Sequence, residues 1–208
     1  MEPQTKRGTD RNYRVDLPYD SWYEFHADLP EKVQINSSQE FLRLWNTCPE
    51  DKDIINVFGP KKVPRFTRVY GKDYKFSRVE HASPPIDDPF VKEVLRFVQT
   101  YSELPYNGVV VNYYRDGSHR MSRHSDSMHG LVEDQAIFIF SYGTDRLFRI
   151  YSKPTNEIQV KPINIILRHN SLIVLCNKFQ EYYQHAIPKA SLTTCPDPMI
   201  NITVRLFK

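Results

Sequence analysis

The chain has 208 residues and is short of the features that mark secreted, membrane and linker proteins. Its three cysteines are far apart and none belongs to a C-x-x-C pair, which excludes a disulfide framework. The longest apolar run, near residues 136–140, is too short to cross a bilayer, and residues 1–7 lack the apolar stretch of a secretory signal. We therefore expect an intracellular protein without a membrane partner, nuclear if the source is eukaryotic.

Glycine is also scarce, at 7 residues against 15 prolines, so the chain is neither a linker nor a collagen-like repeat. Aromatic residues, by contrast, make up 13% of the chain, and most are Tyr or Phe. Such side chains favour β-rich packing or stacking surfaces. With 40% hydrophobic and 25% charged residues, the composition predicts one folded domain over most of the length.

Hydrophobic periodicity places two helices before a β-rich part. Residues 37–40 form a capping box for one helix, and Asp88 followed by Pro89 begins a second that ends near Tyr101. Short strands are predicted at 108–115, 135–141, 146–151, 157–167, 171–176, 182–187 and 199–207. Because strands and helices do not alternate, the pattern predicts a mostly β sandwich or jelly roll with flanking helices.

The N-terminal third gives weaker signals. Residues 1–35 are polar and interrupted by proline, so we expect a flexible or loosely docked extension, with the folded domain at 36–208. Residues 63–79 alternate as a strand pair, with a break at 70–73.

The segment from Lys61 to Arg78 is strongly basic, with seven Lys or Arg residues and a single acid, Asp73. The aromatic residues interleaved with these charges are Phe66, Tyr70, Tyr74 and Phe76. Cations that neutralise phosphates, beside rings that stack on bases, are typical of nucleic-acid-binding surfaces. A solvated β-hairpin with ordinary surface charges is the alternative.

His124 and Asp126 form an H-x-D pair. In an extended segment, residues two apart project from the same face, so both side chains can reach one metal ion. His185, on a predicted strand, is a third candidate ligand. Two imidazoles and one carboxylate make the facial triad of non-haem Fe(II) oxygenases. An H-x-D pair alone is a weak signal, and a hydrogen-bonded core histidine is the alternative for His185.

The motifs around the triad strengthen this interpretation. Asn112-Tyr113-Tyr114 precedes the H-x-D pair, and residues 201–205 read Asn-Ile-Thr-Val-Arg. In this order, the motifs N-x-Y, H-x-D, H and N-x-T-x-R resemble the AlkB family of Fe(II)/2-oxoglutarate dioxygenases. The resemblance extends upstream to about residue 54. There, Val57-Phe58-Gly59, Val63-Pro64-Arg65 and Tyr74-Lys75-Phe76-Ser77 are similar to the nucleotide-recognition lid of the members that repair alkylated duplex DNA.

This resemblance implies a double-stranded β-helix (jelly-roll, cupin-like) core at about 107–208, with an N-terminal nucleotide-recognition lid at about 54–80. The implied Fe(II) ligands, which are also the catalytic residues, are His124, Asp126 and His185. The implied 2-oxoglutarate contacts are Asn112, Tyr114, Asn201, Thr203 and Arg205. The implied substrate contacts are Phe58, Gly59, Arg65, Tyr74 and Phe76. Among them, Phe58 would be a wedge in the duplex, Phe76 would sandwich the extruded base against His124, and Arg65 would grip phosphate.

The implied activity is oxidative dealkylation of N-alkylated bases, with O2 and 2-oxoglutarate consumed and formaldehyde, succinate and CO2 released. DNA is favoured as the substrate, and RNA stays open as an alternative. Nucleic acid is then the expected partner, and we expect a monomer. Two alternatives stay open. One is a non-catalytic or cosubstrate-impaired nucleic-acid-binding relative, and the other is a dioxygenase that acts on a protein or a small molecule.

Two positions depart from the family pattern. The arginine of N-x-T-x-R usually has a second arginine six residues earlier that pairs with a 2-oxoglutarate carboxylate, and here that position is Met199. Either 2-oxoglutarate binds weakly, another base such as Arg205 or Arg149 replaces the contact, or the cosubstrate site is degenerate. The family's acidic residue just after H-x-D, which helps to read the damaged base, is also absent, because Ser127 and Met128 follow Asp126.

Overall fold

The computed structural model describes residues 5–8, 11–52, 54–56, 60–72, 74–76, 79–81, 84–176 and 178–208. The early strands are β1 (Thr5–Gly8), β2 (Asn12–Leu17), β3 (Ser21–His26), β4 (Ile54–Asn56), β5 (Pro60–Lys62), β6 (Phe66–Gly71), β7 (Tyr74–Phe76) and β8 (Val79–His81). The later strands are β9 (Gly108–Tyr114), β10 (Met121–His124), β11 (Ile137–Gly143), β12 (Arg146–Ser152), β13 (Ile163–Leu167), β14 (Ser171–Leu175), β15 (Tyr183–Ile187) and β16 (Met199–Arg205). The helices are η1 (Glu31–Val33), α1 (Ser38–Trp45), α2 (Pro89–Ser102) and α3 (Phe179–Tyr182).

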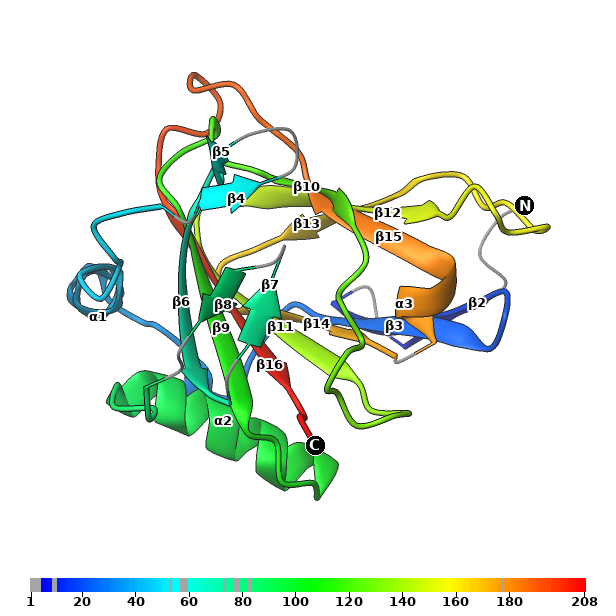
Figure 1. The fold of residues 1–208 in the computed structure, drawn as a ribbon, viewed down its shortest axis with the longest axis horizontal. Helices are drawn as coiled ribbons and strands as arrows, with labels where there is room; N and C mark the ends of the chain where they lie inside the picture. Colours follow the sequence, from blue (N-terminus) through cyan, green and yellow to red (C-terminus); the bar gives the residue numbers. More distant parts are fainter. Residues whose placement is uncertain are drawn as a thin grey trace.

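Two antiparallel sheets face each other and form the jelly-roll core (Figure 1). The large sheet has the order β1-β2-β3-β14-β11-β16-β9-β6, and the small sheet has the order β10-β15-β12-β13. From β9 to β16 the chain crosses between the two sheets at almost every step, with β12 and β13 as the one consecutive pair in the same sheet. This is the winding of a double-stranded β-helix, so the predicted fold class is confirmed.

The large sheet is buried on both faces, which explains the continuous burial of β9, β14 and β16. Its inner face packs against the small sheet, where Ile139, Phe148 and Ile187 belong to one hydrophobic cluster. Its outer face packs against α2, whose Val91 and Val94 belong to the second cluster (Figure 1). In the small sheet, alternate residues of β12 are buried, as expected for strands with one face toward the core.

Both predicted helices are present, and each begins where its capping residues place it. The Ser37 hydroxyl accepts a hydrogen bond from the backbone N–H of Glu40, whose carboxylate accepts one from the N–H of Ser37. Asp88 caps α2 by accepting from the N–H groups of Phe90 and Val91. The Arg43 guanidinium, on α1, also pairs with the Asp88 carboxylate at 2.7 Å, so one buried acid joins the two helices.

The expectation of a flexible or loosely docked extension at residues 1–35 is wrong for the part that the structure describes. The strands β2 and β3 form a hairpin, and β3 pairs with β14, with Phe25 opposite Ile173. Tyr19 and Asp20 turn the hairpin with positive φ angles of 67° and 51°. The Tyr19 ring stacks on Tyr182 with 4.3 Å between ring centroids. The β2–β3 hairpin therefore extends the large sheet, and its buried side chains pack into the core.

Other boundaries also differ from the predicted ones. The strands β6 and β7 are not partners, because β6 pairs with β9 at the edge of the large sheet and β7 pairs with β8. Of the predicted strand at 157–167, only β13 forms. In the part before β13, the Ile158 N–H donates to the Tyr19 hydroxyl and not to a neighbouring strand. None of the described helices has the length and apolar character needed to cross a membrane. The proposed lid at 54–80 is described in part, as the hairpins β4–β5 and β7–β8 and the strand β6.

The role of the β2–β3 hairpin can be tested through Phe25, which is buried in the core. We expect Phe25→Ala to lower the free energy of unfolding by about 3–5 kcal/mol, because it removes a buried ring and leaves a cavity. Denaturant unfolding followed by circular dichroism measures the loss. Leu192→Ala is the control, since Leu192 is exposed. Equal stabilities of the two variants would mean that the hairpin does not belong to the folding unit.

Candidate active site

The structure brings the three predicted metal ligands together. One ligand atom from each of His124, Asp126 and His185 lies within 4.8 Å of the others. The His124 and His185 rings have their centroids 4.3 Å apart, and His124 Nε2 is 3.5 Å from Asp126 Oδ1. This separation suits three donors that converge on one ion from one side.

Strand pairing explains why ligands from distant parts of the chain meet. β10 pairs with β15, and His124, the last residue of β10, lies opposite His185. The chain then leaves the sheet, and two contacts hold it near α3 and β15. The Ser125 hydroxyl donates to the Tyr183 carbonyl at 2.8 Å, and the Asp126 N–H donates to the Gln180 side-chain carbonyl at 2.9 Å. The segment of α3 and β15, which carries His185, therefore also positions Asp126.

The groups around the triad favour the protonation states that metal binding requires. His124 Nδ1 lies 2.9 Å from the Ser122 carbonyl oxygen and donates to it in the tautomer that leaves Nε2 to the metal. Burial opposes the charge on Asp126, but the Arg205 guanidinium, 2.9 Å away, holds its pKa well below the usual range. Burial, together with the nearby His124, lowers the pKa of His185 to about 3. At neutral pH the site thus offers a carboxylate and a neutral imidazole.

Two buried atoms of the three predicted ligands have no hydrogen-bond partner among the described residues, namely Asp126 Oδ2 and His185 Nδ1. Buried polar atoms without partners are costly, and a bound cation would relieve this cost. Phe148 stacks on the His185 ring at 5.2 Å and fixes its plane. Two imidazoles and one carboxylate are the donor set of non-haem Fe(II) sites, so the residues present fit that metal.

A cavity adjoins the triad inside the barrel. The residues that line it are Asn112, Met121, Asp126, Ile139, Phe148, His185, Ile187, Asn201, Thr203 and Arg205. Four of the five residues predicted to contact 2-oxoglutarate belong to this lining, because alternate residues of β9 and β16 face inward and Asn112 lies opposite Asn201. The fifth, Tyr114, lies two residues after Asn112 on the same face of β9 and is fully buried.

The predicted substrate contacts are only partly described. Phe58 and Gly59 lie outside the described residues, and Tyr74 and Phe76 are described only through the backbone of β7. Arg65 is buried, and its Nε donates to Asn112 Oδ1 at 2.8 Å. This guanidinium supports the wall of the cavity, and the grip of Arg65 on phosphate stays a prediction.

The two bases considered as substitutes for an arginine at position 199 are both engaged elsewhere. Met199 is fully buried and lies opposite Tyr114. Arg149 faces away from the core, and its Nε donates to Asn164 Oδ1 at 2.7 Å. Arg205 pairs with Asp126. Arg149 does not replace the missing arginine, because the alternation of β12 turns its side chain away from the core. Arg205 is engaged in an ion pair with a predicted metal ligand.

Gln180 is the site residue that sequence reasoning missed. It is buried, and its side chain holds the backbone of Asp126. It lies in the short helix α3, and neither a motif nor a periodic pattern marks it. Gln180 precedes His185 by five residues, but this spacing indicates a shared site only once α3 is known.

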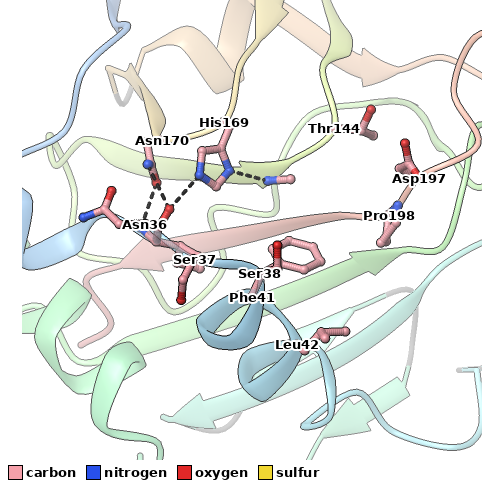
Figure 2. A pocket seen from close by; sticks show the side chains of 12 residues that line it. Asn36, Ser37, Ser38, Phe41, Leu42, Thr144, His169, Asn170, Asp197 and Pro198 are labelled. Atoms are coloured by element: carbon pink, nitrogen blue, oxygen red, sulfur yellow. Dashed lines mark hydrogen bonds between the residues drawn. The ribbon is translucent and has the colours of Figure 1, made fainter.

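A larger cavity lies apart from the triad, beside the start of α1 (Figure 2). Two of the residues that line it, His169 and Asn170, have structural partners. His169 Nδ1 accepts from the Gly143 N–H at 3.0 Å, and His169 Nε2 donates to the Ile35 carbonyl at 2.7 Å. The Asn170 amide bonds both the N–H and the carbonyl of Ile35. These bonds attach the segment before α1 to the β13–β14 turn, so this cavity is not the reaction centre.

Comparisons with known proteins agree with this geometry. Residues 33–205 match the family model described as the 2OG-Fe(II) oxygenase superfamily. The Mus musculus alpha-ketoglutarate-dependent dioxygenase alkB homolog 3 is 28% identical over 148 residues, which are 68% of this chain and 51% of that protein. The Homo sapiens DNA oxidative demethylase ALKBH2 is 26% identical over 161 residues, which are 73% of this chain and 60% of that protein.

The chain spans about half the length of the first of these curated relatives. The solved structure of OsALKBH1 superposes with a TM-score of 0.59 and covers 88% of this chain and 96% of its own, at 15% identity, which shows a shared fold. The chain belongs to the 2OG-Fe(II) oxygenase superfamily, and within it to the AlkB family that its motifs resemble. This membership implies Fe(II), 2-oxoglutarate and O2.

The positioning role of Gln180 gives a direct prediction. We expect Gln180→Leu to weaken metal binding by about 10- to 100-fold, because the Asp126 backbone loses the acceptor that fixes it. Titration with Mn(II), followed by electron paramagnetic resonance, measures the affinity. Gln184→Leu is the matched control, since Gln184 bonds Arg123 at the surface. Equal losses in the two variants would contradict this role.

Proposed function

We propose that the chain is an Fe(II)/2-oxoglutarate dioxygenase that oxidatively dealkylates N-alkylated bases in DNA and releases formaldehyde, succinate and CO2. The observation that carries the proposal is the meeting of His124, Asp126 and His185 beside a cavity lined by amides and a guanidinium. The name of the human relative, a DNA oxidative demethylase, supports the same reaction class.

Bound at the triad, Fe(II) with 2-oxoglutarate and O2 supplies the oxidising chemistry. The contribution of the chain is position and electrostatics. Asn112 and Thr203 offer hydrogen bonds to the cosubstrate, and Arg205 keeps Asp126 ionised. The Asn201 amide donates to the Phe140 carbonyl and the Ser141 hydroxyl, so it supports the cavity wall. Ile139, Phe148 and Ile187 are the apolar walls that exclude water.

The exposure of the ligands indicates where substrate enters. The His124 side chain is 24% exposed, whereas that of Asp126 is 5% exposed, and His185 is buried. A metal held by these residues would therefore be open on the His124 side. A base reaching this opening has to leave a duplex stack, or come from a single strand.

A group of cations supports nucleic acid as the substrate. Lys52 and Arg115 both lie over the Phe66 ring, at 4.9 and 5.4 Å from its centroid. Burial and the positive charge of Arg115, with a smaller effect of Lys62, lower the pKa of Lys52. Cations that repel one another beside an aromatic ring are stabilised by phosphates, which favours a polyanionic partner.

Met199 favours a second candidate, a nucleic-acid-binding relative with an impaired cosubstrate site. Such a protein would bind DNA with the same salt dependence and leave 2-oxoglutarate unconverted. Ser127 and Met128 stand where the family has an acidic residue that helps to read the damaged base. We therefore propose the reaction without assigning a preferred lesion.

Product analysis tests the proposal. We expect purified protein with Fe(II), 2-oxoglutarate and an N-methylated oligonucleotide to release formaldehyde and succinate in equal amounts, as measured by mass spectrometry. His124→Ala is the control and should release neither. Absence of both products from the unaltered protein, with DNA binding intact, would select the second candidate. Succinate formation without any affinity for nucleic acid would select a protein or small-molecule substrate.

The cation group gives a separate prediction for binding. We expect replacement of both Lys52 and Arg115 by Ala to weaken DNA binding and to reduce the slope of log Kd against log salt by about 0.9 for each phosphate that the variant no longer neutralises. Fluorescence anisotropy over a range of salt concentrations measures the slope. Lys178→Ala is the control, because Lys178 pairs with Asp20 near the β2–β3 hairpin. An unchanged slope in the double variant would remove this surface from the proposal.

A further inference from the structure

A buried guanidinium lies inside the barrel with no carboxylate partner among the described residues. Arg146, the first residue of β12, is 2% exposed and faces inward on the same side of the strand as Phe148. Its Nη1 donates to the Asp116 carbonyl, and its Nη2 donates to the carbonyls of His119 and Pro188. These bonds hold the group in place but leave its positive charge uncompensated.

An unpartnered hydroxyl lies close to this charge. Tyr114 is fully buried, and its Oη has no hydrogen-bond partner among the described residues. Arg146 Cζ is 5.7 Å from the centroid of the Tyr114 ring. Burial raises the pKa of Tyr114 to about 12, while the charges of Arg65 and Arg146 act in the opposite direction. Two guanidinium groups therefore act on one buried hydroxyl.

Neither Tyr114 nor Arg146 is among the residues that line the cavity of the metal site, but β9 links Tyr114 to that cavity. Asn112, two residues before Tyr114 on the same face of β9, lines the cavity and accepts from Arg65. On the facing strand β16, Met199 lies opposite Tyr114, and Asn201 lies opposite Asn112. At the position of Tyr114, the inner face of β16 thus carries the apolar Met199 and no cation. Arg146, which comes from β12, is a cation near Tyr114.

We propose that Arg146 and Tyr114 form the subsite for the distal carboxylate of 2-oxoglutarate, with Arg146 in the role that an arginine at position 199 would fill. This inference rests on the proposed function. Three of the five N–H groups of the guanidinium bond backbone carbonyls, and the remaining ones are donors for a carboxylate. The Tyr114 hydroxyl would donate the second bond. A carboxylate at this point compensates the buried charge, which carbonyl partners alone do not.

The test compares two 2-oxo acids that differ in the distal carboxylate. Isothermal titration calorimetry is done on the full chain loaded with Mn(II), with 2-oxoglutarate and with 2-oxobutanoate as ligands. We expect the unaltered protein to bind 2-oxoglutarate at least about 10-fold more tightly. Arg146→Gln should remove most of this preference while the affinity for 2-oxobutanoate and for Mn(II) stays the same. Arg149→Gln, on the outer face of the same strand, should keep the preference.

Tyr114→Phe is the second variant, because Arg146→Gln loses bonds that support the fold. It removes only an unpartnered hydroxyl, so we expect an unchanged melting temperature and a several-fold loss of 2-oxoglutarate affinity. A preference kept in Arg146→Gln, or kept in Tyr114→Phe where Arg146→Gln does not fold, overturns the subsite. A protein that binds Mn(II) but neither 2-oxo acid contradicts the proposed function itself.

Discussion

Antiparallel pairing between β10 and β15 places His124 opposite His185, and the rest of the site depends on that contact. The pairing brings two imidazoles from distant parts of the chain onto one face of the small sheet. Ser125 and Gln180 then hold the chain after β10 against the same segment, which sets the position of Asp126. A shift of register by one residue would turn the side chain of His185 to the other face of the sheet and separate the ligands.

Charge in the barrel is arranged along its inner face. Arg205 lies beside Asp126 at the metal end, whereas Arg146 and Tyr114 lie together away from it. Between them, Asn112 and Asn201 face each other across β9 and β16. Two separate cations with amides between them suit a ligand that carries a negative group at each end. With Arg146 in the proposed role, the apolar Met199 is compatible with a polar cavity.

Much of this could be predicted from the sequence because it depends on local patterns. The H-x-D spacing, the presence of strands near β9 and β16 and the caps of α1 and α2 require only neighbouring residues. Features set by tertiary pairing could not be read in this way. The β2–β3 hairpin depends on β14, and the burial of Arg65 and the inward direction of Arg146 depend on which strands face each other. Gln180 depends on α3, a helix of four residues without a periodic signal.

The central claim is that one metal ion is held by these three side chains. A crystal structure of the protein grown with Mn(II) without oxygen, measured near the Mn absorption edge, tests it most directly. The account predicts one strong anomalous peak between His124, Asp126 and His185, within bonding distance of all three. A peak at another place, or none at the triad with Mn(II) present in excess, would contradict it.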